Sequence, residues 1–181
     1  MRKIQIVILL VIVSIAISQG IGLKILIPMM QTGLSSIEIL ILSGISAALF
    51  LPFVLEMTIN GKLWHFLPIA LIIGSISGFI SGYFLDCLLS NVLIGLLSVL
   101  CIYLSTFAKI KLIYQPVLCF LLLAILSLGM NIFGHRLSGY DAVFYIELGV
   151  VTIKDYLICG GLCAWMTSKL NLNNDRILGL N

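Results

Sequence analysis

Long apolar stretches, separated by a few polar residues, recur along the whole chain. Five of them contain no formal charge, and the sixth is interrupted by Glu147, Lys154 and Asp155. A helix of about 20 residues, rising about 1.5 Å per residue, crosses the roughly 30 Å hydrocarbon layer of a bilayer. The pattern therefore predicts an all-α, polytopic membrane helix bundle with about six transmembrane helices and short loops. The predicted spans are residues 4–23, 39–55, 63–85, 87–108, 112–134 and about 143–166.

The second predicted span has recognisable ends. Glu38 and Glu56 bracket it, and Pro52 should kink or end its helix because proline lacks an amide donor. Residues 60–65 predict a turn followed by a tryptophan, Trp64, at the level of the lipid headgroups. The sequence therefore predicts that this span ends at Leu55, directly before Glu56.

Composition strengthens the membrane prediction. Of 181 residues, 61% are hydrophobic and 9% are charged, whereas soluble domains carry about 25% charged residues. We expect one integral membrane domain over residues 1–181, in contact with the lipid bilayer, with residues 170–181 as a polar tail in water. This leaves no room for catalysis in a separate soluble domain. The ten basic residues form no tract that would bind nucleic acid.

The basic residues also predict an orientation. Six spans place both termini on the same side, and lysine and arginine favour the cytoplasmic side of a membrane. With both termini cytoplasmic, the outer loops hold only Lys24 and Arg136. The inner segments then hold Arg2, Lys3, Lys62, Lys109, Lys111, Lys169 and Arg176. We therefore predict that both termini are cytoplasmic.

Small residues recur at every fourth position of the third span, and the series ends in a carboxylate. Its members are Ala70, Gly74, Gly78, Gly82 and Asp86. This spacing forms one ridge on a helix, and glycines on a ridge let a neighbouring helix approach closely. The ridge therefore predicts either packing within the bundle or a surface for a partner protein. An ionisable residue at the end of a membrane helix must also reach water, a partner or a functional path.

Almost no loop separates the third and fourth spans. Residues 86–91 are the only polar interruption between them. We therefore expect a tight antiparallel hairpin with its turn near Ser90 and Asn91, and we expect Asp86 on the outer side of the membrane.

The second group of candidate residues is charged and lies in or before the sixth span: Arg136, Asp141, Glu147, Lys154 and Asp155. An unpaired charge at a membrane helix centre costs roughly 3 kcal/mol on insertion scales, so Lys154 should find a partner or a hydrated cavity. Glu147 and Lys154, seven residues apart, share a helix face, whereas Asp155 points elsewhere unless the helix is distorted. Two interpretations remain open: an internal ion pair that fixes helix packing, or a polar pocket or groove for a substrate or partner.

Motifs of known enzymes are missing from the sequence. There is no Gly-x-Ser-x-Gly elbow, no His-Glu-x-x-His zinc pair and no Cys-x-x-Cys pair. The five cysteines lie in or beside apolar runs, where cysteine usually acts as a small hydrophobe. We therefore expect no catalytic residue, no metal site and no cofactor.

Residues 78–103 resemble a signature of the rod-shape-determining membrane protein family MreD. That signature has the form Gly-x-x-x-Gly-x-x-x-Asp, a short turn, another glycine and a tyrosine. The matching residues are Gly78, Gly82, Asp86, Gly95 and Tyr103. The resemblance implies a non-enzymatic, multi-pass component of the bacterial inner membrane. Such a component supports cell shape and side-wall peptidoglycan synthesis through helix contacts with other membrane proteins of the elongation machinery.

The same segment is similar to the substrate-binding S components of energy-coupling-factor vitamin transporters, which are small six-helix proteins. This resemblance implies the alternative function, binding of a small vitamin-like molecule, with a transporter coupling subunit as partner. In S components a small-xxx-small ridge on the first helix meets that subunit, and Ala16 and Gly20 have the same spacing here. The two resemblances leave open whether the chain is a scaffold or a transport component.

Overall fold

Helices make up nearly all of the computed structural model of this chain. It describes the backbone of residues 3–30, 36–108, 111–136 and 142–177, and the side chains of residues 5–28, 41–108, 111–133 and 145–170. The α-helices are α1 (Lys3–Met30), α2 (Ser36–Leu49), α3 (Leu51–Asn60), α4 (Phe66–Ser81), α5 (Phe84–Phe107), α6 (Gln115–Arg136) and α7 (Ala142–Ile177). Two short 3-10 turns, η1 (Leu63–His65) and η2 (Leu112–Tyr114), precede α4 and α6. No strand occurs in these described ranges, which confirms the all-α prediction.

Five helical segments in the described part of the chain are long and apolar enough to cross a membrane. They are Gln5–Pro28, Ile41–Asn60, Leu63–Ser81, Phe84–Phe107 and Leu112–Phe133. Helix α7 is a sixth long helix, and it carries the charged residues Glu147, Lys154 and Asp155. The prediction of a multi-pass bundle therefore agrees with the structure, with five to six helices that could span a bilayer.

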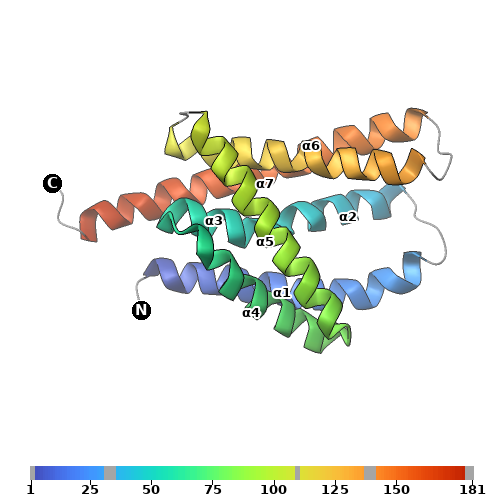
Figure 1. The fold of residues 1–181 in the computed structure, drawn as a ribbon, viewed down its shortest axis with the longest axis horizontal. Helices are drawn as coiled ribbons and strands as arrows, with labels where there is room; N and C mark the ends of the chain where they lie inside the picture. The colour runs from blue at the N-terminus through green and yellow to red at the C-terminus, as the bar shows by residue number, and fades with distance from the viewer. Residues whose placement is uncertain (1–2, 31–35, 109–110, 137–141, 178–181) are drawn as a thin grey trace.

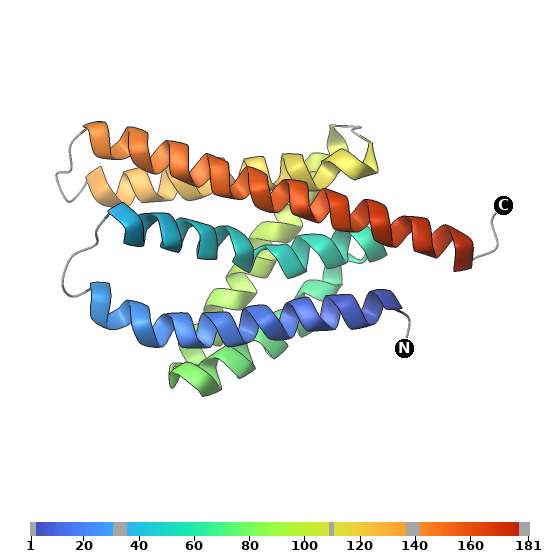
Figure 2. The same ribbon diagram turned by 180° about the vertical axis from the view of Figure 1, so that it is seen from behind.

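The chain runs back and forth along one long axis. Helices α2 and α3 together make one crossing, and α4 and α5 form a hairpin that lies obliquely across the others (Figure 1). The start of α1 and the end of α7 lie at the same end of the bundle (Figures 1 and 2). Helix α1 extends through Pro28 to Met30, and α7 continues through most of the predicted polar tail to Ile177.

Pro52 marks a break in the second predicted span, but the span continues beyond it as a second helix. Helix α2 stops at Leu49, and Pro52 lies in the first turn of α3, where its missing amide costs no helical hydrogen bond. Val54 N–H bonds to Phe50 O at 3.0 Å as the helix resumes. Because α3 continues to Asn60, the prediction that Glu56 lies at the edge of a span is wrong. Glu56 is inside α3 and buried.

The turn between α4 and α5 comes earlier than its predicted position near Ser90 and Asn91. Gly82 adopts a left-handed conformation, with φ at 86°, and its amide bonds to Gly78 O at 2.9 Å. Glycine tolerates this conformation because it lacks a Cβ, so it ends α4 at Ser81. Helix α5 then starts at Phe84. An uncharged run does not reveal such a stop, which explains the error.

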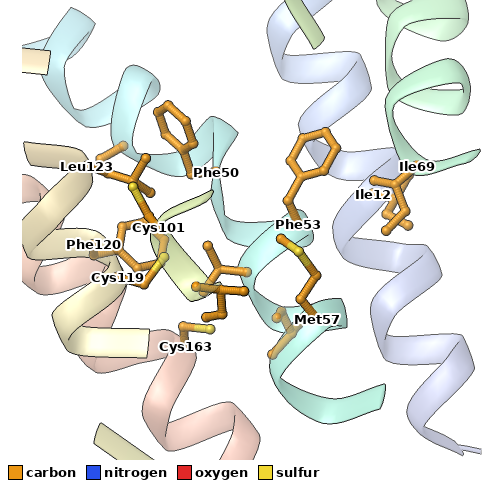
Figure 3. Packing of buried hydrophobic residues seen from close by; sticks show 14 of the residues in the cluster. Ile12, Phe50, Phe53, Met57, Ile69, Cys101, Cys119, Phe120, Leu123 and Cys163 are labelled. Carbon is orange, nitrogen blue, oxygen red and sulfur yellow. The ribbon is translucent and has the colours of Figure 1, made fainter. Parts of the chain in front are cut away.

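Helix α3 lies at the centre of the bundle, and every residue from Pro52 to Thr58 is buried. Phe53 and Met57 point from it into a cluster of apolar side chains, and Ile12 of α1 meets Ile69 of α4 beside them (Figure 3). The outer surface is also apolar: Phe79 is 88% exposed, and many large hydrophobic side chains of α1, α5 and α6 are exposed. A large apolar exterior of this kind suits contact with lipid rather than water.

Candidate functional site

The four-residue ridge is divided between a packing surface and a turn. Gly74 and Gly78 are buried on α4 against the backbone of α5. A Cβ on Gly74 would lie 2.9 Å from Leu88 Cα, and a Cβ on Gly78 would lie 2.7 Å from Phe84 Cα. These two glycines let the helix backbones touch, as small residues do in membrane hairpins. Their contact is within the chain.

The last two members of the series, Gly82 and Asp86, do not lie on the packing surface of α4. Gly82 forms the left-handed turn, and Asp86 lies in the first turn of α5, not on α4. The expectation that Asp86 closes the α4 ridge is therefore wrong, because the reversal at Gly82 moves it to the next helix. Asp86 is exposed, and its charge is favourable near a helix N-terminus. Ala70, the first member, is fully buried.

The small residues of α1 also pack inside the chain. Ala16 and Gly20 are buried, and a Cβ on Gly20 would lie 2.7 Å from Ile80 Cβ of α4. In this structure α4 thus occupies the position that the resemblance to S components gives to a coupling subunit.

The charged residues of the predicted polar pocket do not all point into one cavity. Glu147 is exposed, and the side chain of Lys154 is 50% exposed. The Asp155 side chain is only 14% exposed, and its Oδ1 lies 3.7 Å from Lys154 Nζ. The side chain of Arg136 and the whole of Asp141 lie outside the described residues.

Asp155 is held against α2. Its Oδ2 lies 3.8 Å from the point where a Cβ on Gly44 would be. Oδ2 is buried and has no hydrogen-bond partner among the described residues, and the same is true of Ser43 Oγ on α2. Burial of a polar atom without a partner is costly. Asp155 therefore faces inward, while Lys154 faces out from α7.

A cluster around Glu56 was missed by the sequence analysis. Asn60 Nδ2 donates to Glu56 Oε1 at 2.6 Å, and His65 Nδ1 lies 2.6 Å from the same oxygen. Glu56 and Asn60 are one helical turn apart, and η1 brings His65 back over the end of α3. The spacing of Glu56 and Asn60, with a histidine just after the predicted turn, was the available signal.

An open cavity of about 670 Å³ adjoins this cluster, at the end of the bundle where α1 begins and α3 ends. Its polar lining includes Glu56, Lys62 and His65, and its apolar lining comes from α1 and the start of α4. Trp64 also lines it and makes an edge contact with the His65 ring, with centroids 4.4 Å apart.

Another polar contact joins helices far apart in sequence. Asn91 Nδ2 of α5 donates to Gln19 Oε1 of α1 at 3.1 Å and to Cys87 O at 2.8 Å. Both side chains are buried, so this contact fixes how α1 and α5 sit around α4. It explains the position of Asn91 in the packed hairpin rather than at its turn.

The five cysteines are free thiols, and most are buried in the apolar core. Among the described residues, no group of three or more histidine, cysteine, aspartate or glutamate side chains could hold a metal ion.

Fold and site together define a class, the helical multi-pass membrane proteins. No protein-family model, curated protein or solved structure matches this chain.

Proposed function

We propose that the chain is a non-enzymatic component of a membrane protein complex and that its partner binds the outward face of α7. One observation carries this proposal: Lys154 is half-exposed on an apolar helix face. Lys154 is 12 residues from the start of α7, a rise of about 18 Å, which is near the middle of a bilayer if α7 begins at its surface.

The surroundings of Lys154 offer it little compensation. Val150, Ile153, Leu157 and Ile158 surround it in an open hollow on α7. Asp155, at 3.7 Å, is its one ion-pair partner among the described residues. A lysine facing lipid at this depth costs roughly 3 kcal/mol on insertion scales. A partner helix with a carboxylate or hydroxyl would cover the apolar face and pair with the ammonium group.

The resemblance of residues 78–103 to MreD guides the choice of partner. We propose the membrane proteins of the elongation machinery, in the bacterial inner membrane, and a role in side-wall synthesis and cell shape. The charges at the bundle ends support the predicted orientation. Lys62 lies between α3 and η1, Lys111 directly precedes η2, and Lys169 lies near the end of α7. These segments lie toward the end of the bundle where α1 begins, whereas the start of α5, which carries Asp86, lies toward the other end (Figure 1).

The alternative, a vitamin-binding S component, receives less support. It requires polar side chains that converge on an outer pocket, and Glu147 and Lys154 are exposed on α7. A vitamin bound by the purified protein would raise its unfolding temperature by an amount set by RT ln(1 + [L]/Kd). We expect no such shift across a panel of vitamins.

The test uses Val150→Trp, a substitution on the proposed surface. Val150 is 64% exposed, so lipid can accommodate a tryptophan there, whereas a tightly packed partner helix cannot. We expect the variant to fold, and we expect the amount of elongation proteins that copurifies with it to fall at least tenfold. Cells depleted of the parent protein should remain rounded when they express this variant. Leu89→Trp is the matched control, because Leu89 is 62% exposed on α5. Equal copurification and normal cell shape with Val150→Trp would refute the proposed surface.

A further inference from the structure

The cavity beside Glu56 is polar at its mouth and apolar along its inner wall. Gln5, Asn60, Lys62 and Trp64 lie at the end of the bundle, and Ile12 lies about two helical turns deeper along α1 than Gln5. Ile8, Leu9 and Ile69 complete the apolar wall. A molecule that fills this space needs a polar head and an apolar chain.

A head that carries both signs of charge would suit this lining. The Glu56 side chain is only 10% exposed and forms part of the wall, so a donor with a positive charge would meet it. Lys62 is exposed at the mouth and forms no ion pair with any described residue, so it is available to an anion. A primary ammonium and a phosphate, a few bonds apart, would satisfy both.

Trp64 indicates where the cavity lies relative to the bilayer. It is 65% exposed at the mouth, and tryptophan favours the level of the lipid headgroups. Because the cavity opens at the end of the bundle, we infer that its mouth lies at the depth of the lipid phosphates and that its apolar wall continues toward the acyl chains.

We propose that this cavity binds an aminophospholipid through its phosphoethanolamine head, with the ammonium at Glu56, the phosphate at Lys62 and an acyl chain along Ile8, Ile12 and Ile69. His65 and Asn60 position the carboxylate by donating to Oε1. The site is separate from the α7 surface and does not depend on the function proposed for it.

Trp64 provides a direct probe of this site. The chain has two tryptophans, so Trp165→Phe leaves Trp64 as the one fluorophore of its kind. The full chain is reconstituted in bilayers that contain increasing fractions of lipid brominated on the acyl chain near the head. Brominated phosphatidylethanolamine should quench Trp64 half-maximally at about a tenfold lower mole fraction than brominated phosphatidylcholine. Choline retains the positive charge and the phosphate but has no N–H donor for Glu56.

Two variants and one control assign the effect to the proposed contacts. Glu56→Gln should abolish the preference for ethanolamine over choline. Lys62→Met should weaken quenching by both lipids, and it tests the site without touching a buried group. Lys111→Met, an exposed lysine at the same end of the bundle, should change nothing. Equal quenching by the two lipids in the parent protein, an unchanged preference in Glu56→Gln, or unchanged quenching in Lys62→Met would each overturn the proposal.

A last arm distinguishes the lipid from a soluble molecule with the same head. Phosphoethanolamine is added to bilayers that contain brominated phosphatidylethanolamine. We expect it to leave the quenching unchanged, because it lacks the acyl chain that the apolar wall contacts. Recovery of Trp64 fluorescence would assign the cavity to a soluble ligand and overturn the lipid proposal.

Discussion

Glu56 and Lys154 are both ionisable residues in apolar helices, yet they differ in burial and in the partners that compensate their charge. Glu56 is buried, and two side chains of its own chain donate to it. Lys154 is half-exposed on an apolar surface, and its pair with Asp155 is 3.7 Å long. The first charge is compensated within the fold, whereas the second is compensated only in part.

This difference separates a structural charge from one that is available to a partner. Removal of a well-bonded buried group leaves its donors unpaired and destabilises the fold. Removal of an exposed charge from an apolar surface costs the fold little and changes what the surface can bind. The stability of variants in detergent, where no partner is present, should therefore distinguish the two regions.

The largest expected effect is that of Glu56→Ala. The variant leaves His65 Nδ1 and Asn60 Nδ2 without their common acceptor. We expect a loss of about 3 kcal/mol in the free energy of unfolding, which is the low end of the range for breaking a buried ion pair. The loss is at the low end because both donors lie near the end of the bundle, where water can reach them. Equilibrium unfolding in mixed dodecylmaltoside and SDS micelles measures it. Glu147→Ala, which removes an exposed carboxylate, should cost less than about 0.5 kcal/mol. Equal losses for the two variants would remove the contrast.

A smaller effect concerns the Glu56–His65 contact alone. A double-mutant cycle with Glu56→Ala and His65→Ala should give a coupling energy of about 1.5 kcal/mol, because the donor and the carboxylate are 2.6 Å apart. The same unfolding measurement on the two single variants and the double variant gives this value. A coupling energy near zero would mean that Glu56 stabilises α3 by packing, not through the histidine.

The sequence predicted an all-helical chain with several long apolar helices, because uncharged runs of about 20 residues leave few alternatives in a membrane. It also predicted the close approach made by Gly74 and Gly78, since regular spacing on a helix defines a face. It failed where a single residue reverses the chain. Gly82 belongs to the same series by spacing, but in the structure it is a turn that moves Asp86 to α5.

The Glu56 cluster shows a second limit of the sequence analysis. A carboxylate at the end of an uncharged run is normally assigned to the end of the span, and Pro52 was expected to kink or end the helix just before it. The helix continues instead, and η1 places His65 over Glu56. Only the path of the chain after Gly61 determines this contact, and apolar periodicity carries no information about such a path.

The smallest expected effect is that of neutralising the α7 pair with Lys154→Met and Asp155→Asn together. Loss of Lys154 alone would leave a mostly buried carboxylate without its ion-pair partner, so both charges are removed at once. A partly exposed pair contributes little, and we expect a change within about 0.5 kcal/mol in the same mixed micelles. The double variant should nevertheless lose its partner in the membrane, as Val150→Trp does. A loss of stability comparable to that of Glu56→Ala would show that the α7 pair fixes helix packing, which is the alternative to a partner surface.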